Sequence, residues 1–265
     1  MATHSQIETK ISPPAAANER RSAVTLAIDY VWYIGAYLIF AVLGCGVSII
    51  CLPLSFIFVG RGAKRFGQRL IHSLFAFFIW YVQLRGLIKF DFGDLPRLRG
   101  RKGVIIVANH PCLIDVLLVV SRLPNVICIM KASLTSNLVL CGTARLAGYV
   151  DNRSHREMVV QCKARLVEGS NFLIFPEGTR TVEPGVNPFK MGFALVAKVA
   201  RAPVQTIFIE TISPFLGKSW PLLKWPSFPV TYTLRLGKEF VPPPDMDVKD
   251  FGKSIEDYFR ANLRG

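Results

Sequence analysis

The chain has 265 residues, enough for one large α/β domain or for a smaller domain with an appended segment. Hydrophobic residues make up 51% of it and the mean hydropathy is +0.36, which is high for a soluble domain. The formal net charge of +14 predicts an anionic partner, either nucleic acid or an anionic membrane surface. Six cysteines without a C-x-x-C pair argue against a disulfide framework or a zinc site, and favour free thiols in a reducing compartment.

Three regions are expected along the chain, at residues 1–29, 30–102 and 103–265. Residues 1–22 are polar, which predicts a disordered arm rather than a cleavable signal peptide. From Tyr30 to Gly60 no residue is charged. A helix of this length would measure roughly 46 Å, against about 30 Å for the hydrocarbon core of a bilayer. The segment is therefore predicted to enter a membrane, as one tilted span or as a re-entrant hairpin broken near Gly44, Gly46 and Pro53.

Basic residues border a second apolar segment. Leu70–Leu84 contains no Lys, Arg, Asp or Glu and is rich in aromatic residues, which predicts a helix lying in the headgroup layer. Between Arg61 and Lys102, ten basic residues minus two acidic ones leave +8 of the total +14. This placement favours anionic lipid on a cytoplasmic leaflet. Nucleic acid is the rival partner, but no helix-turn-helix, zinc-finger or RNA-binding signature accompanies the charge.

From residue 103 onward, short apolar runs alternate with helical patterns. The expected strands are Val104–Ala108, Val126–Met130, Phe172–Phe175, Val204–Ile209 and Val230–Leu236. The expected helices are Leu113–Ser121, Leu134–Leu146, Glu157–Val167, Gly192–Ala200 and Val248–Asn262. This alternation predicts a layered α/β domain with a mostly parallel central sheet flanked by helices. The Pro- and Trp-rich stretch from Trp220 to Pro229 is either a loop that touches the membrane or a rigid surface connection.

A histidine and an aspartate follow the first of these strands. His110 and Asp115 are separated by five positions, and they lie between the apolar runs Val104–Ala108 and Val116–Val120. The ends of buried strands are where α/β proteins place their chemistry. An aspartate beside a histidine can accept its ring N–H and support the imidazolium that forms when the ring takes a proton. The alternative is a surface loop in which Asp115 caps a helix.

Two further strand ends carry charge. Phe172–Phe175 runs into a turn with Glu177 and Arg180, which could fix a polyol and a phosphate, while Gly178 lets the backbone approach a ligand. The alternative is a surface turn with its own ion pair.

Arg153 follows a third apolar run, beside the helix that Ser154 caps. Its planar guanidinium suits a phosphate, although it could simply pair with Asp151. Lys190 opens another helix and either adds a second positive charge or is solvated.

With these junctions the chain resembles the glycerolipid (lysophospholipid) acyltransferase family, over roughly residues 70–240. Asn109-His110 and Asp115 match the family motif N-H-x4-D. Gly148 and Arg153 match the second motif, and Phe175 to Arg180 match the third. Cys112 stands where the family usually has serine. The 1-acyl-glycerol-3-phosphate acyltransferases of bacterial phospholipid synthesis are the similar members, which implies a bacterial inner membrane with the catalytic domain on its cytoplasmic face.

The resemblance implies transfer of an acyl chain from acyl-CoA or acyl carrier protein to a lipid hydroxyl, without a cofactor. His110 would be the general base and Asp115 would orient it. The acceptor, a lysophospholipid, would be held by Arg153, Glu177, Gly178, Thr179, Arg180 and Lys190. Cys112 as a covalent nucleophile is a rival mechanism. No metal site is expected, because the four histidines lack ligand spacing.

Two alternatives from other classes stay open. One is an acyltransferase for a specialised acceptor, such as an amino lipid or an aryl-polyene lipid. The other is a non-enzymatic, lipid-binding membrane protein, which would have no use for a base at a strand end.

Overall fold

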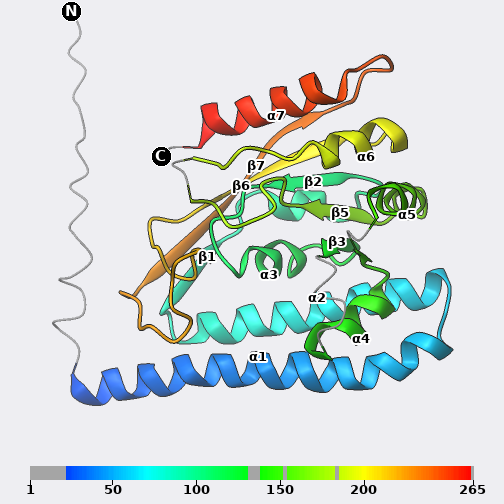
Figure 1. The fold of residues 1–265 in the computed structure, drawn as a ribbon. Helices are drawn as coiled ribbons and strands as arrows, with labels where there is room; N and C mark the ends of the chain where they lie inside the picture. The colour runs from blue at the N-terminus through cyan, green and yellow to red at the C-terminus, as the bar shows by residue number, and fades with distance from the viewer. Residues whose placement is uncertain (1–21, 131–137, 152–153, 183–184, 264–265) are drawn as a thin grey trace, which may run out of the picture.

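The central feature is a twisted sheet with helices on both faces (Figure 1). The computed structural model describes residues 22–130, 138–151, 154–182 and 185–263. Within them the sheet has seven strands in the order β1-β7-β6-β2-β5-β3-β4. They are β1 (Ile88–Asp91), β2 (Ile105–Ala108), β3 (Val126–Met130), β4 (Val150–Asp151), β5 (Asn171–Ile174), β6 (Val204–Glu210) and β7 (Val230–Phe240). Only β6 and β7 pair antiparallel, so the predicted, mostly parallel α/β sheet is confirmed.

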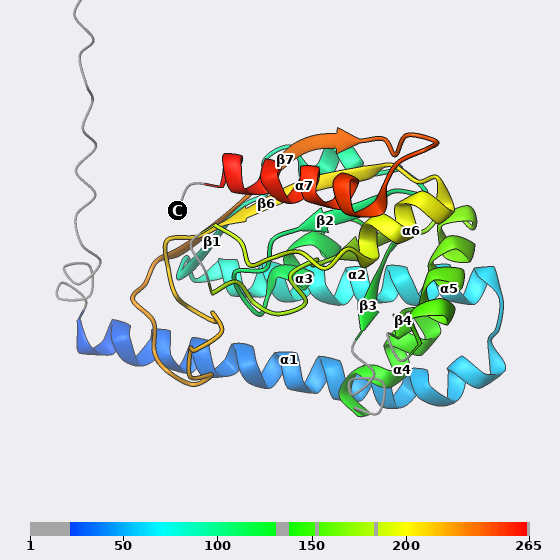
Figure 2. The ribbon, with the colours of Figure 1, turned by 45° about the horizontal axis from the view of Figure 1, so that its top comes forward.

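Helices pack on both faces of this sheet (Figures 1 and 2). They are α1 (Ala23–Ile57), α2 (Arg61–Leu84), α3 (Asp115–Val120), α4 (Leu138–Ala147), α5 (His155–Val167), α6 (Gly192–Ala200) and α7 (Val248–Asn262), with a short 3-10 helix at Leu95–Leu98. In β2, Ile106 joins a core with α2 and α3, while Ile105 joins one with α5, α6 and α7. This alternation is the period of two expected of a strand that is buried on both faces.

Strand β1 shows that the sheet begins earlier than residue 103. Its residues Ile88–Asp91 pair in parallel with β7 from Val230 onward. Helix α2 begins at Arg61, before the expected start at Leu70, and buries Ile71 and Ile79 in the core of the domain. The segment at 61–102 is therefore packed into the α/β layers as well as being basic and apolar.

Helix α1 is one uninterrupted helix of 35 residues. It begins at Ala23 after the cap Ser22, inside the region expected to be an arm, and it runs through Gly44, Gly46 and Pro53. The hairpin broken at these positions is therefore wrong, and the segment forms one continuous helix. Within the described residues, α1 is the one helix long and apolar enough to cross a membrane.

Both ends of α1 are fastened to the rest of the molecule. Near its start, the buried carboxylate of Asp29 pairs with Arg85 Nε at 2.7 Å, just after α2. Near its end, Ser48 Oγ accepts the Gly142 N–H of α4 at 2.9 Å. A Cβ on Gly142 would lie 2.0 Å from the Ser48 carbonyl oxygen, so the contact requires glycine. As a result α1 lies along the domain rather than standing away from it (Figures 1 and 2).

Candidate active site

The His110–Asp115 pair forms where β2 ends and α3 begins. Asn109 fixes this strand end, because its side-chain amide donates to the Ile209 carbonyl and accepts the Ile209 N–H, both at 2.8 Å. The His110 Nδ1 atom lies 2.8 Å from Asp115 Oδ2. Because a carboxylate oxygen accepts, Nδ1 carries the proton and Nε2 is left as the basic atom of the neutral ring. The His110 side chain is 18% exposed and Asp115 is 0% exposed.

Asp115 is oriented by Cys112 as well as by His110. The Cys112 N–H donates to Oδ2 at 2.9 Å and the thiol donates to Oδ1 at 2.7 Å. Burial raises the pKa of the Asp115 carboxyl, and the hydrogen bonds from His110 and Cys112 act in the opposite direction. Burial, and then the charge of Asp115, raise the pKa of the Cys112 thiol well above its ordinary value. The thiol is thus held protonated, which argues against the covalent nucleophile.

The turn after β5 lies directly against His110. The His110 ring stacks on the Phe175 ring with centroids 4.3 Å apart. The buried Glu177 accepts the His110 N–H at 2.9 Å, the Thr181 hydroxyl at 2.8 Å and the Asn187 N–H at 2.9 Å. The two strand ends predicted to meet are therefore side by side. Both oxygens of Glu177 bind the protein itself, so this carboxylate supports the backbone of the site.

Arg180 reaches across to the segment that follows β6. Its Nη1 atom donates to the carbonyls of Leu216 at 3.0 Å and Gly217 at 2.8 Å. The Leu216 carbonyl also accepts the Leu113 N–H at 3.0 Å. Leu216 has a φ of 59°, a left-handed conformation that costs a non-glycine residue about 1–2 kcal/mol. These hydrogen bonds hold that conformation. They also connect residues 213–217 to the loop between β2 and α3 that carries His110, called the histidine loop below.

Gly178 and Lys190 form a close contact beside this turn. Gly178 has a φ of 68°, and a Cβ there would lie 2.8 Å from Lys190 Nζ. Lys190 is exposed and its N–H donates to the Pro176 carbonyl at 2.8 Å. Thr179 is half-buried in the same turn. Lys190 and Arg180 thus bring positive charge to the strand ends that carry His110, whereas Arg153 lies outside the described residues.

Several residues of the site had no predicted role. Asn187 and Thr181 bind Glu177, and the buried Tyr232 donates its hydroxyl to the Phe215 carbonyl at 3.1 Å behind Cys112. Thr181 and Asn187 had a signal in the sequence, because both are polar and lie within ten positions of Glu177. The aromatic Phe175, directly after β5, was a signal of the same kind. Tyr232 had none, because only the fold brings it to Cys112.

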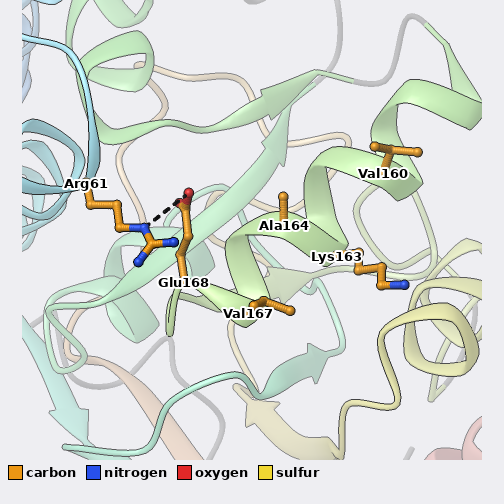
Figure 3. A pocket seen from close by; sticks show the side chains of 6 residues that line it. All are labelled: Arg61, Val160, Lys163, Ala164, Val167 and Glu168. Atoms are coloured by element: carbon orange, nitrogen blue, oxygen red, sulfur yellow. Dashed lines mark ion pairs between the residues drawn. The ribbon is translucent and has the colours of Figure 1, made fainter.

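A further hollow of the described surface lies outside the predicted site residues. Within the described ranges, no three His, Cys, Asp or Glu side chains are placed to hold a metal ion. A shallow hollow between the start of α2 and α5 is lined by Arg61, Lys163 and the apolar side chains of Val160 and Val167 (Figure 3). It includes the Arg61–Glu168 ion pair at 3.7 Å and none of the predicted site residues.

The segment that carries this geometry is similar to known proteins. Residues 89–210 match the family model described as Acyltransferase. Over 165 residues the chain is 28% identical to human 1-acyl-sn-glycerol-3-phosphate acyltransferase beta, covering 57% of this chain and 58% of that protein. Over 124 residues it is 28% identical to the putative 1-acyl-sn-glycerol-3-phosphate acyltransferase acl-1 of Caenorhabditis elegans, covering 44% and 47%. The chain thus matches about half the length of these curated relatives.

A solved structure shares the fold. The 1-acyl-sn-glycerophosphate acyltransferase PlsC of Thermotoga maritima superposes with a TM-score of 0.66 at 21% identity, covering 88% of this chain and 94% of that one. At this identity the likeness concerns the fold alone. The family match includes both the His110–Asp115 pair and the Pro176–Arg180 turn, so this part of the chain is similar to the Acyltransferase family.

Proposed function

We propose that the protein is a membrane-bound O-acyltransferase that moves an acyl chain from acyl-CoA or acyl carrier protein to a lysophospholipid hydroxyl. The proposed acceptor is 1-acyl-glycerol-3-phosphate, the substrate in the names of the relatives, and its acylation would give phosphatidic acid. The observation that carries the proposal is the 2.8 Å contact between His110 Nδ1 and the buried Asp115, because it leaves Nε2 as a base at a strand end.

The chemistry follows from this tautomer. His110 Nε2 takes the proton of the acceptor hydroxyl as its oxygen attacks the thioester carbonyl of the donor. The new ester C–O bond forms, the C–S bond breaks, and the imidazolium returns the proton to the leaving thiolate. Asp115 stabilises the imidazolium meanwhile, so general base catalysis of typically 10²–10⁴-fold is available without an acyl-enzyme.

The acceptor phosphate is proposed to lie among the cationic groups at the same strand ends. Arg180 and Lys190 supply positive charge beside Gly178 and Thr179, and Arg153 is assigned to the same role by its place in the motif. Glu177 contributes by holding the His110 backbone, which orients the turn for the glycerol portion.

The membrane arrangement is proposed to be in-plane, with α1 lying in one leaflet. Both ends of α1 contact the domain, through Asp29 and Ser48, so a crossing helix would draw the α/β layers into the bilayer. The outward side of α1 is an exposed apolar stripe: Val24, Val31, Leu38, Val42, Ile49 and Phe56. The exposed Arg61 and Arg65 at the start of α2 suit anionic headgroups. The assignment to the cytoplasmic face of a bacterial inner membrane belongs to the same proposal.

The test measures thiol release from acyl-CoA and from acyl carrier protein by the purified full chain. With lysophosphatidic acid present we expect release, and an at least 100-fold lower rate for His110→Ala. His72→Ala is the matched histidine control, because the His72 ring bonds the Val120 carbonyl at the opposite end of α3 from Asp115. Near-normal activity of folded His110→Ala would contradict the mechanism.

The choice of acceptor has a separate readout. Thiol release with amino-lipid or polyene acceptors but not with lysophosphatidic acid would show that the acceptor is a specialised lipid and not a lysophospholipid. The absence of release with every acceptor from folded protein would favour the lipid-binding alternative.

A further inference from the structure

The segment after β6 forms a closed turn with an apolar tip. The Lys224 N–H donates to the Pro221 carbonyl at 3.0 Å, and the Trp220 Nε1 atom donates to the Lys224 carbonyl at 3.3 Å. The two residues between them, Leu222 and Leu223, have exposed fractions of 51% and 67%. Because the backbone of this turn is closed by its own hydrogen bonds, the two leucines are held outward.

This turn is fastened to α1. The Tyr37 hydroxyl donates to the Leu222 carbonyl at 2.5 Å, and the Tyr33 hydroxyl donates to the Lys224 carbonyl at 3.0 Å. The Trp225 ring packs on the Tyr33 ring with centroids 5.2 Å apart. Both ribbon views show the segment reaching down from the sheet to the level of α1 (Figures 1 and 2). The turn therefore lies against α1 itself, on the side of Tyr33 and Tyr37.

The other end of the same segment is fastened to the active site. Leu216 accepts hydrogen bonds from Leu113 of the histidine loop and from Arg180. The segment therefore connects the turn to the loop that carries His110.

The side chains around the tip match an interface between water and lipid. Tryptophan and lysine are the residues that favour the headgroup layer, where an aromatic ring meets lipid and an ammonium meets phosphate. The Lys224 ammonium lies 4.8 Å from the centroid of the Trp220 ring, and Lys218 is exposed two residues before Trp220. Two apolar side chains at the tip with cationic and aromatic neighbours form a surface complementary to anionic lipid.

We infer that the Pro221–Lys224 turn is a second membrane contact, which inserts Leu222 and Leu223 into the leaflet that receives α1 and sets the distance of His110 from the lipid surface. The inference rests on the proposed position of α1 in the membrane. It adds a second membrane contact, from the catalytic half of the chain.

Tryptophan fluorescence tests the insertion directly. The full chain is mixed with phosphatidylcholine/phosphatidylglycerol vesicles whose acyl chains are brominated near the headgroup. We expect Trp220→Phe to remove part of the quenching, and Leu222→Ser/Leu223→Ser to reduce what Trp220 contributes. Val241→Ser is the matched control, because Val241 is 71% exposed at the far end of β7. Equal quenching in all four proteins would overturn the inference.

Activity supplies an independent readout. A leucine moved from water into hydrocarbon gains about tenfold or more in affinity. We expect Leu222→Ser/Leu223→Ser to lower the rate on vesicle-borne acceptor about tenfold and to leave the rate in detergent micelles unchanged. An equal loss in both formats would overturn the inference, since it would mean a damaged site rather than a lost membrane contact.

Two other outcomes have distinct signatures. If the tip contacts a second copy of the chain, the double variant lowers the sedimentation mass without lipid and leaves quenching unchanged, which contradicts membrane insertion. If the wild-type chain transfers no acyl group in any format, the proposed function fails, and the quenching experiment still decides the fate of the turn.

Discussion

Cys112 takes the place of a hydroxyl donor next to the buried Asp115 carboxylate. A thiol is a weaker donor than a hydroxyl, yet its contact with Oδ1 leaves Oδ2 directed at His110. Cys112 is therefore a positioning residue for the pair, supported by Tyr232 behind it. The fold explains why a cysteine here is compatible with acyl transfer that passes through no cysteine ester.

Replacing Cys112 is expected to move the pH profile of the reaction. The thiol hydrogen bond from Cys112 lowers the pKa of Asp115, so its loss raises the proton affinity of the His110–Asp115 pair, while the bond from the backbone N–H remains. In Cys112→Ala the acid limb of the kcat/KM profile therefore shifts to higher pH, so less base remains at a given acidic pH.

Cys112→Ser is the control for that shift, because its hydroxyl restores a donor and should return the profile toward wild type. A Cys112→Ser variant that behaves like Cys112→Ala, with both folded, would contradict the positioning role.

The residue scale also separates what the sequence predicted from what only the fold supplied. His110 and Asp115 were visible because five positions and two apolar runs place them at one strand end. The partners of Arg180 were not visible. Arg180 binds carbonyls 36 and 37 residues away, and backbone carbonyls leave no signature in a sequence.

At the scale of elements, the contact between α1 and α4 depends on the absence of a side chain at Gly142. Its backbone lies against Ser48 and Leu52 of α1. A Cβ added at Gly142 would clash with both, at 2.0 Å from the Ser48 carbonyl oxygen and 2.8 Å from the Leu52 nitrogen. Helices that approach this closely rely on small residues, as membrane-embedded helices also do. The pair fixes the far end of α1 on the domain.

Gly142→Val is expected to lower the free energy of unfolding by about 1–3 kcal/mol, because α4 must move away from α1. Thermal unfolding of the detergent-solubilised chain measures this change. Gly46→Ala in α1, where an added Cβ would meet nothing within 4 Å, should be neutral or slightly stabilising. Equal melting temperatures for the two variants would show that the close contact does not contribute to stability.

Some strands could be predicted from the sequence and others could not. Strands β2, β3, β5 and β6 were expected because each is a run of apolar, often β-branched residues. Strands β1 and β4 were missed, since β1 has only four residues, two of them charged, and β4 has two residues. Their stability comes from pairing with β7 and β3, which a local pattern does not reveal.

At the scale of the whole molecule, the basic excess and the exposed apolar surface belong to consecutive elements of the chain. The expected excess of +8 between Arg61 and Lys102 begins with α2, directly after the helix α1 that carries the exposed stripe. Hydropathy predicted a membrane segment but left its orientation open. The contacts of Asp29 and Ser48 with the domain, near the two ends of α1, favour a helix lying in the plane of the membrane.

Binding to vesicles is therefore expected to depend on anionic lipid. Each basic residue near an anionic surface contributes about 1 kcal/mol, and the Debye length falls from about 8 Å at 0.15 M salt to about 3 Å at 1 M. We expect flotation with phosphatidylglycerol vesicles to be at least tenfold stronger than with neutral vesicles at low salt. Most of this difference should disappear at 1 M salt, while binding through the apolar stripe remains. Equal binding to both vesicle types would contradict the role of the charge.

The position of α1 also bears on the bilayer itself. An enzyme whose long helix rests on one side, with both ends held against its own domain, meets lipids of a single monolayer. It would collect a one-chain lipid from that monolayer and return a two-chain lipid to the same place. Each turnover would widen one side of the bilayer and leave the other unchanged. The resulting imbalance in area would have to be relieved by a separate protein that moves lipids across, so growth of the two monolayers would be coupled through transport rather than through synthesis.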